Sequence, residues 1–226
     1  TVTAGAATAA APLGIDTLAL APQLKILALL TLLTLLPAIV LTMTSFTRVV
    51  VVLGFVRQGL GTQQSPPTPV IIGIGIFLTM FIMAPVASAI ARDAYEPFTA
   101  GRITQSQAID RAIAPMRTFM LRQTREADLA MFFDATNTPA PRTEEEVPFQ
   151  IAVPAFIVSE LTTAFQMGAM VLLPFLVIDL AVSSVLMSMG MMMMTPATAS
   201  LPLKLLVFVT ADGWHMLVGS LLRSFQ

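Results

Sequence analysis

The chain has 226 residues, of which 56% are hydrophobic and only 11% charged, with a formal net charge of −1. Soluble domains average about 25% charged residues, so this composition indicates contact with lipid or burial in a large assembly. The balanced charge excludes the basic surface that nucleic-acid binding requires. The lack of cysteine excludes disulfides, thiolate metal sites and cysteine nucleophiles, and a single histidine excludes multi-histidine metal centres.

The chain begins with an uncharged segment rich in alanine and threonine, Thr1 to Pro12. This composition favours a mature N-terminus left by removal of a signal peptide, and a trimmed chain is the alternative. We predict that residues 1–23 form a flexible N-terminal segment.

Long charge-free stretches predict the secondary structure. Between Lys25 and Arg48 lie 22 uncharged residues, and similar gaps recur along the chain. A helix needs about 20 mainly apolar residues to cross a bilayer, and strands of a membrane barrel would alternate apolar and polar residues, which these stretches do not. The predicted fold is all-α: kinked hydrophobic helical hairpins with about four membrane-type segments and a small polar helical insert. The four segments are 24–44, 69–91, 156–178 and 201–222.

Four prolines lie inside or beside these segments: Pro37, Pro85, Pro154 and Pro174. Proline removes a backbone donor, so each is expected to kink or end its helix. Broken helices packed against other protein are the predicted arrangement.

The charged residues concentrate between the second and third apolar segments, where residues 92–147 hold 16 of the 25. The resulting organisation is a first hydrophobic hairpin (24–91), a polar insert (92–150) and a second hydrophobic hairpin with a methionine-rich loop (151–226). Because Arg48 and Arg57 precede the second apolar segment, the positive-inside rule predicts a cytoplasmic 57–69 loop and a periplasmic insert.

Local signals predict two helices within the insert. Thr104 and Gln107 form a capping-box pattern that predicts a helix from Gln105. Pro115 predicts the start of a second helix that runs to about Phe133. On that helix Arg125 and Asp128 have the i,i+3 spacing of an ion pair, as Arg122 and Glu126 have the i,i+4 spacing. Residues 137–146 are predicted to form a loop.

Five charged residues stand in otherwise apolar surroundings and are candidate site residues. A charge in such a setting is costly unless it is paired or hydrated, so we interpret them as structural or intersubunit ion pairs. A polar channel lining or a proton site is the alternative. The five are Arg48, Glu160, Asp179, Lys204 and Asp212.

A dense methionine cluster near residue 190 is the other candidate site. A single methionine is usually core filler, but Met191–Met194 are consecutive and so cover every face of a helix. Gly190 before them and Pro196 after them indicate a loop or a helix break. The candidate residues are Met189, Met191, Met192, Met193 and Met194.

Several blocks of the sequence resemble one protein family. They extend over about residues 24–226, and together they are highly specific although no single block is. They include MTSFTRVVVVLG (43–54), LGTQQ (60–64), FLTMFIMAP (77–85), FMLRQTREADL (119–129), PFLVIDL (174–180), MGMMM (189–193) and DGW (212–214). This pattern resembles the FliP family of flagellar type III export-gate subunits, which is related to injectisome proteins.

The resemblance implies a non-enzymatic subunit of a secretion channel in the bacterial inner membrane, within the flagellar basal body. It implies a pentameric ring, with FliQ, FliR, FlhA and FlhB as partners and unfolded flagellar proteins as the exported substrates. It also implies that the methionine loop lines the channel and closes it as a gasket. No cofactor and no metal are expected.

The chain departs from the family pattern at two positions. Thr162 stands where the family often has lysine, and Met194 stands where valine is common. Two other functions remain open from the sequence: the equivalent subunit of a virulence injectisome, and an ion-coupled carrier that uses Glu160 and Asp179. An enzyme is the weakest hypothesis because no catalytic constellation stands out.

Overall fold

The computed structural model describes most of the chain after residue 21. The described residues are 22–62, 65–136, 139, 141, 143, 146–191 and 195–226. The predictions for residues 1–21, for much of the 137–146 loop and for Met192, Met193 and Met194 therefore lie outside the described residues.

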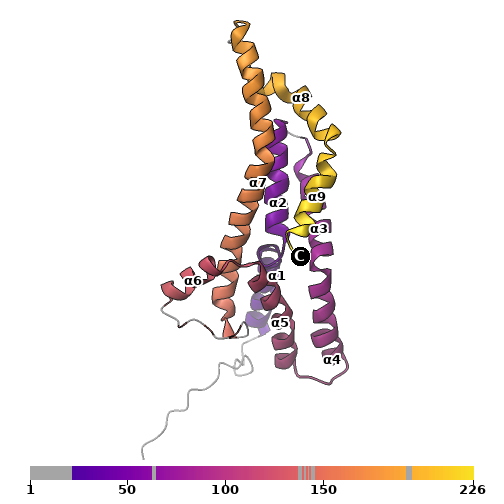
Figure 1. Ribbon diagram of the computed structural model, residues 1–226. Helices are drawn as coiled ribbons and strands as arrows, with labels where there is room; N and C mark the ends of the chain where they lie inside the picture. Colours follow the sequence, from indigo (N-terminus) through magenta and orange to yellow (C-terminus); the bar gives the residue numbers. More distant parts are fainter. Residues whose placement is uncertain are drawn as a thin grey trace, which may run out of the picture. The chain divides into compact units, whose positions relative to one another are not determined.

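Every regular element in the described residues is helical, which confirms the predicted all-α class (Figure 1). The helices are α1 Pro22–Thr42, α2 Phe46–Leu60, α3 Thr68–Ile90, α4 Glu96–Thr99, α5 Gln105–Gln123, α6 Glu126–Ala135, α7 Phe149–Ser188, α8 Pro196–Thr210 and α9 Gly213–Arg223, with a π-helical turn, η2 Ala91–Tyr95, between α3 and α4. The chain divides into two units, Thr1–Ile39 and Val40–Gln226. The first contains most of α1, and all the other helices belong to the second.

Helix α2 is the central element of the second unit. It packs against α7, α3 and α8, and its buried side chains make up much of the main hydrophobic core. Full burial of a valine or leucine side chain contributes about 1.5–3 kcal/mol. The α2 residues in this core are Val49, Val52, Leu53, Val56 and Leu60.

Two glycines allow α2 and α7 to approach closely. A Cβ atom at Gly168 of α7 would lie 2.1 Å from the Phe55 ring, and one at Gly59 of α2 would lie 2.5 Å from the Phe175 ring. Each helix therefore contributes one aromatic ring and one glycine to the same seam, and a larger residue at either glycine would displace a ring.

Helix α7 is 40 residues long and runs through both of its prolines. At 1.5 Å per residue its length is about 60 Å. Of the two predicted effects of proline, a kink or the end of a helix, the structure contradicts the second, because Pro37, Pro85, Pro154 and Pro174 all lie inside helices. The chain instead turns at Ala211 and Asp212, where α8 and α9 meet at a bend of 63°.

The polar insert confirms one local prediction and corrects another. Thr104 and Gln107 form the predicted capping box, with each side chain bonded to the other residue's backbone N–H. Pro115 does not start a helix, because α5 continues through it to Gln123. The break lies at Thr124 and Arg125, whose backbones are extended, and it is stabilised by a bond from the Arg125 N–H to the Ser159 hydroxyl.

The predicted count of about four membrane-type segments stays a prediction, and length and composition identify two or three of them. In the residues that the structure describes, two helical segments are long and apolar enough to cross a membrane, Thr68–Thr99 and Phe149–Ser188. The bent pair α8–α9 gives a third if it is one span. The predicted segment 24–44 is helical from Pro22 to Thr42, as α1.

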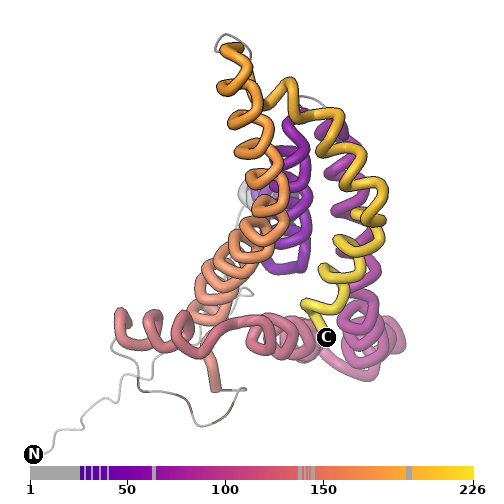
Figure 2. Tube along the Cα trace, turned by 45° about the horizontal axis from the view of Figure 1, so that its top comes forward, coloured from indigo at the N-terminus to yellow at the C-terminus, as the bar shows by residue number. Residues whose placement is uncertain are grey.

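The insert helices gather near the start of α7. Figure 2 shows α5 and α6 following one another across this end of the helix, and α8 lies beside its other half. A small second core joins α6 to the start of α7 and consists of Phe133, Val147, Ile151 and Ala152. Helix α5 also contacts α7 and the π-helical turn η2.

Candidate functional site

Arg48 and Glu160 form an ion pair in the interior of the second unit. Arg48 is 2% exposed and Glu160 is fully buried. The Arg48 Nε donates to Glu160 Oε2 at 2.9 Å, and its Nη2 donates to Glu160 Oε1. This two-pronged contact joins α2 to α7 across 112 residues of sequence, and such forked geometry is the strong form of an arginine–carboxylate pair.

The rest of the Arg48 guanidinium is also bonded. Nη1 donates to the Ser224 carbonyl at 2.8 Å and to the Ser224 hydroxyl at 3.1 Å, and Nη2 donates to Gln123 Oε1 at 3.1 Å. The guanidinium carbon lies 3.9 Å from the centre of the Phe225 ring. Each of the three guanidinium nitrogens therefore has an acceptor, which offsets much of the cost of burying the charge.

Two of the five residues of this centre were predicted from the sequence, and the other three were not. Arg48 and Glu160 were found because a charge interrupts an apolar run. Gln123, Ser224 and Phe225 are ordinary polar and aromatic residues near helix ends, and nothing in their local pattern distinguishes them. Gln123 is 75 residues from Arg48 in the sequence and Ser224 is 176 residues from it. These contacts therefore depend on the tertiary structure and not on a local pattern.

Lys204 and Asp179 form a second polar centre between α8 and α7. Lys204 is 2% exposed, and its Nζ donates to Asp179 Oδ2 at 2.7 Å. The Ser200 hydroxyl donates to the other carboxylate oxygen, Oδ1. The ammonium also lies beside Gly61, where α2 ends, and a cation is favourable near the last carbonyls of a helix.

A third group of bonds attaches the break between α5 and α6 to α7. The buried Ser159 hydroxyl donates to Asp128 Oδ2 at 2.5 Å. Arg125 Nη2 donates to Thr163 Oγ1 at 3.2 Å and to Gln166 Oε1 at 2.6 Å. The predicted Arg125–Asp128 ion pair is therefore wrong, because both side chains bond to α7 across the interface.

The remaining charged candidate, Asp212, lies apart from these centres. It is exposed at the bend between α8 and α9, with a left-handed backbone (φ 50°) that aspartate tolerates better than most residues. The structure thus brings Arg48 to Glu160 and Asp179 to Lys204, and it places Asp212 in a turn.

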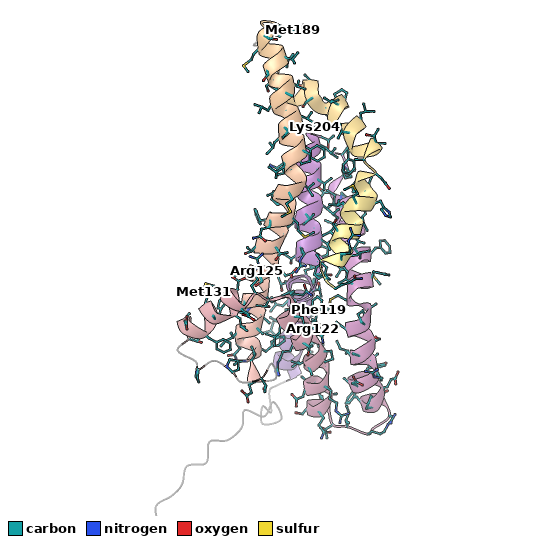
Figure 3. The ribbon with its side chains drawn as sticks, viewed as in Figure 1. Phe119, Arg122, Arg125, Met131, Met189 and Lys204 are labelled. Carbon is teal, nitrogen blue, oxygen red and sulfur yellow. The ribbon has the colours of Figure 1, made fainter. Side chains whose placement is uncertain are left out.

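The methionine segment, defined here as residues 189–194, follows the far end of α7. Met189 is 67% exposed and Met191 is 41% exposed. Gly190 has φ 76°, the left-handed conformation that commonly follows the end of a helix, and α7 ends at Ser188. Figure 3 shows Met189 at the end of α7 opposite to the end near Arg125 and Met131. Met192, Met193 and Met194 are outside the described residues.

Among the residues that the structure describes, no three histidine, aspartate or glutamate side chains lie together in a way that would hold a metal ion. The acids that a carrier hypothesis invokes, Glu160 and Asp179, each bond to a buried cation. Glu160 therefore connects α7 to α2, and Asp179 connects α7 to α8.

Comparison with known proteins decides the family. The model of the FliP family matches residues 29–221, which include α2, α7, the Arg48–Glu160 pair and the Lys204–Asp179 pair. The chain belongs to the FliP family. This confirms the resemblance drawn from the sequence blocks.

Relatives from distant bacteria extend the match along the FliP-family chain. The flagellar biosynthetic protein FliP of Pectobacterium carotovorum is 52% identical, over 90% of this chain and 79% of the relative. That of Bacillus subtilis is 49% identical, over 89% and 91%, and that of Aquifex aeolicus is 42% identical, over 92% and 87%. FliP-family proteins are components of the flagellar export apparatus and not enzymes, and the long apolar helices are those of a membrane-associated protein.

Proposed function

We propose that this chain is a channel-forming subunit of the flagellar type III export gate, in which copies of the chain surround a passage closed by their methionine segments. The carrying observation is the placement of Met189 and Met191, exposed on either side of the left-handed Gly190 at the end of a 40-residue helix. The flagellar names of the relatives favour the flagellar apparatus over the injectisome.

The exposed apolar surface supports assembly with other subunits and with lipid. Phe77 and Phe81 on α3 are 75% and 69% exposed, and Met170 and Val177 on α7 are 71% and 65% exposed. Apolar surface of this extent is not stable in water and marks an interface or a membrane contact. A ring, a pentamer by the family resemblance, would cover much of it.

The chemistry of methionine suits a seal that must open for chains of any sequence. Its side chain is unbranched, flexible and polarizable, so several copies can fill an irregular gap or contact a passing polypeptide without strong preference. Met189 and Met191 carry this role together with Met192, Met193 and Met194. A one-sided stripe of methionines would instead favour packing on a single neighbour.

The proposal includes a location and partners. The apolar helices would lie in or against the bacterial inner membrane at the flagellar basal body, with the polar insert 92–150 on the periplasmic side. FliQ and FliR would complete the ring, FlhA and FlhB would deliver substrates, and unfolded flagellar proteins would pass through. Arg48 and Arg57, which precede α3, support this orientation by the positive-inside rule, and the apolar character of α3 and α7 supports the membrane location.

Replacement of the methionine segment tests the proposal. We expect that changing Met189 and Met191–Met194 to alanine leaves the assembled complex intact but makes the resting inner membrane leaky to small ions, because alanine cannot fill the constriction. Membrane conductance measures the leak, and native mass spectrometry of the complex, co-expressed with its neighbours, measures assembly.

Met131→Ala is the matched control, since Met131 is also an exposed methionine, at 49%, but lies on α6 in the insert. It should leave conductance unchanged. A fully assembled complex with five alanines and no added leak would overturn the gasket role, and an equal leak from Met131→Ala would show that the effect is not specific to the segment.

A further inference from the structure

The turn that follows α9 reaches back to the buried arginine of α2. Ser224 accepts two bonds from Arg48 Nη1, at 2.8 Å to its carbonyl and 3.1 Å to its hydroxyl. The Phe225 ring lies over the guanidinium, 3.9 Å from ring centre to the guanidinium carbon. A cation this close to a ring face is attracted by the ring's electrons, and more strongly where water is excluded.

The same phenylalanine also contacts the polar insert. Its ring stacks on Phe119 of α5, with centroids 6.4 Å apart and planes at 16°. Gln123 Nε2 donates to the Phe225 carbonyl at 3.4 Å, and the Gln123 side-chain oxygen accepts from Arg48. One ring and one amide therefore connect three elements: α2, α5 and the turn after α9.

We propose that Ser224 and Phe225 form a clasp that couples α9 to the insert helix α5 through Arg48. The Phe225 ring has Arg48 on it and stacks on Phe119, so an aliphatic residue of similar volume would fill the space without reproducing either contact. The clasp is a conformational device that adds to the channel proposal without depending on it.

The other contacts of Arg48 determine which helices stay joined when the clasp opens. When Ser224 and Phe225 move away, Arg48 loses the acceptors of Nη1 and its aromatic neighbour together. Its bonds to Glu160 stay in place, so α2 and α7 remain joined while α5 loses its attachment to α9. Opening of the clasp thereby separates α9 from the insert, while the Arg48–Glu160 bonds still join α2 to α7.

Hydrogen exchange of the full chain, purified with its co-expressed partners, tests the clasp. We expect Phe225→Leu to accelerate amide exchange in α5 and α9 by roughly tenfold and to leave α8 unchanged, because the loss of one local set of contacts opens one cooperative region. Phe225→Trp, which restores an aromatic face, should return the native rates. Phe77→Leu is the control, since Phe77 is an exposed phenylalanine of α3.

Two results would overturn the clasp. One is unchanged exchange in α5 of Phe225→Leu, and the other is equal acceleration in α5 and α8, which would indicate general destabilisation. A double-substitution cycle gives a separate measurement: Phe119→Leu and Phe225→Leu should have non-additive effects on α5 exchange, because they remove the same stacked pair. Strict additivity would also contradict the coupling.

Discussion

Near its start α7 carries Glu160, fully buried and bonded to an arginine whose other donors are occupied, whereas beyond Ser188 the same stretch of chain exposes Met189 and Met191 to the surroundings. The first region is specified by directional bonds among α2, α5, α7 and the turn after α9. In the second region the Met189 and Met191 side chains are apolar and flexible, and the bonds of these two residues are those of their backbone N–H groups to the last turn of α7. The difference supports the proposed function, in which a fixed scaffold carries a segment that adapts to many partners.

The largest loss of folding stability is expected when Glu160 is replaced. Glu160→Ala leaves the Arg48 charge buried without its carboxylate, and breaking a buried pair in this way costs about 3–5 kcal/mol. Reversible unfolding in mixed micelles, followed by circular dichroism, measures the change. Asp93→Ala is the control, because the Arg92–Asp93 pair is exposed on the insert side of α3 and its loss should not be measurable. A Glu160→Ala protein as stable as the control would remove the scaffold role of this centre.

The glycine seam between α2 and α7 is expected to show the next largest effect. Gly168→Ala places a Cβ against the Phe55 ring, and such overpacking costs about 1–3 kcal/mol. Gly73→Ala on α3 is the matched control, since nothing lies within 4 Å of its Cβ, and alanine is the better helix former. Thermal unfolding of the two variants side by side should separate them. Equal midpoints would mean that α2 and α7 do not depend on this close approach.

A smaller effect is expected at the second polar centre. Lys204→Met should cost about 1 kcal/mol, since Asp179 is partly exposed and water can replace the lost ammonium. Guanidinium unfolding curves compare the variant with Asp179→Asn, which keeps the approximate shape of the pair. If Lys204→Met lowers the free energy of unfolding as much as Glu160→Ala does, the two polar centres contribute equally to the stability of the fold.

The smallest effect on stability is expected in the methionine segment. Met189→Ala should change the free energy of unfolding by less than about 0.5 kcal/mol, because the side chain is exposed and packs on no described core. Pulse proteolysis of the purified subunit measures this change. A marked loss of stability would place Met189 in the scaffold and weaken its assignment to the gate.

Local signals in the sequence were sufficient for much of the fold. The charge-free stretches predicted an all-α protein, and the Thr104–Gln107 pattern predicted the start of α5, because composition and capping act within one or two turns of helix. The prediction of a helix start at Pro115 was wrong for the same reason. It used a local signal, and Pro115 lies inside the longer helix α5. The break falls at Thr124, where the hydroxyl of Ser159 supplies a partner for the next backbone N–H.

The candidate site was only partly predictable. Arg48 and Glu160 were predicted as candidate residues because they are charges in apolar surroundings. Their pairing could not be predicted, because they are 112 residues apart and no sequence periodicity relates them. The contribution of Phe225 depends on three elements meeting in space. The bend at Ala211–Asp212 was not predicted either, because hydropathy does not reveal where a helix ends within an apolar segment.

The length of α7 has a mechanical consequence. Met189 follows Glu160 by 29 residues, which corresponds to about 44 Å along a helix axis. Because α2 and α8 are packed along α7 as far as Asp179, the three helices would move together as one lever about the buried glutamate. A tilt of about 5° at that point would move the tip by roughly 4 Å, about the width of one side chain. Slight reorientation at the anchored end would thus be enough to widen or narrow an aperture bounded by several such tips.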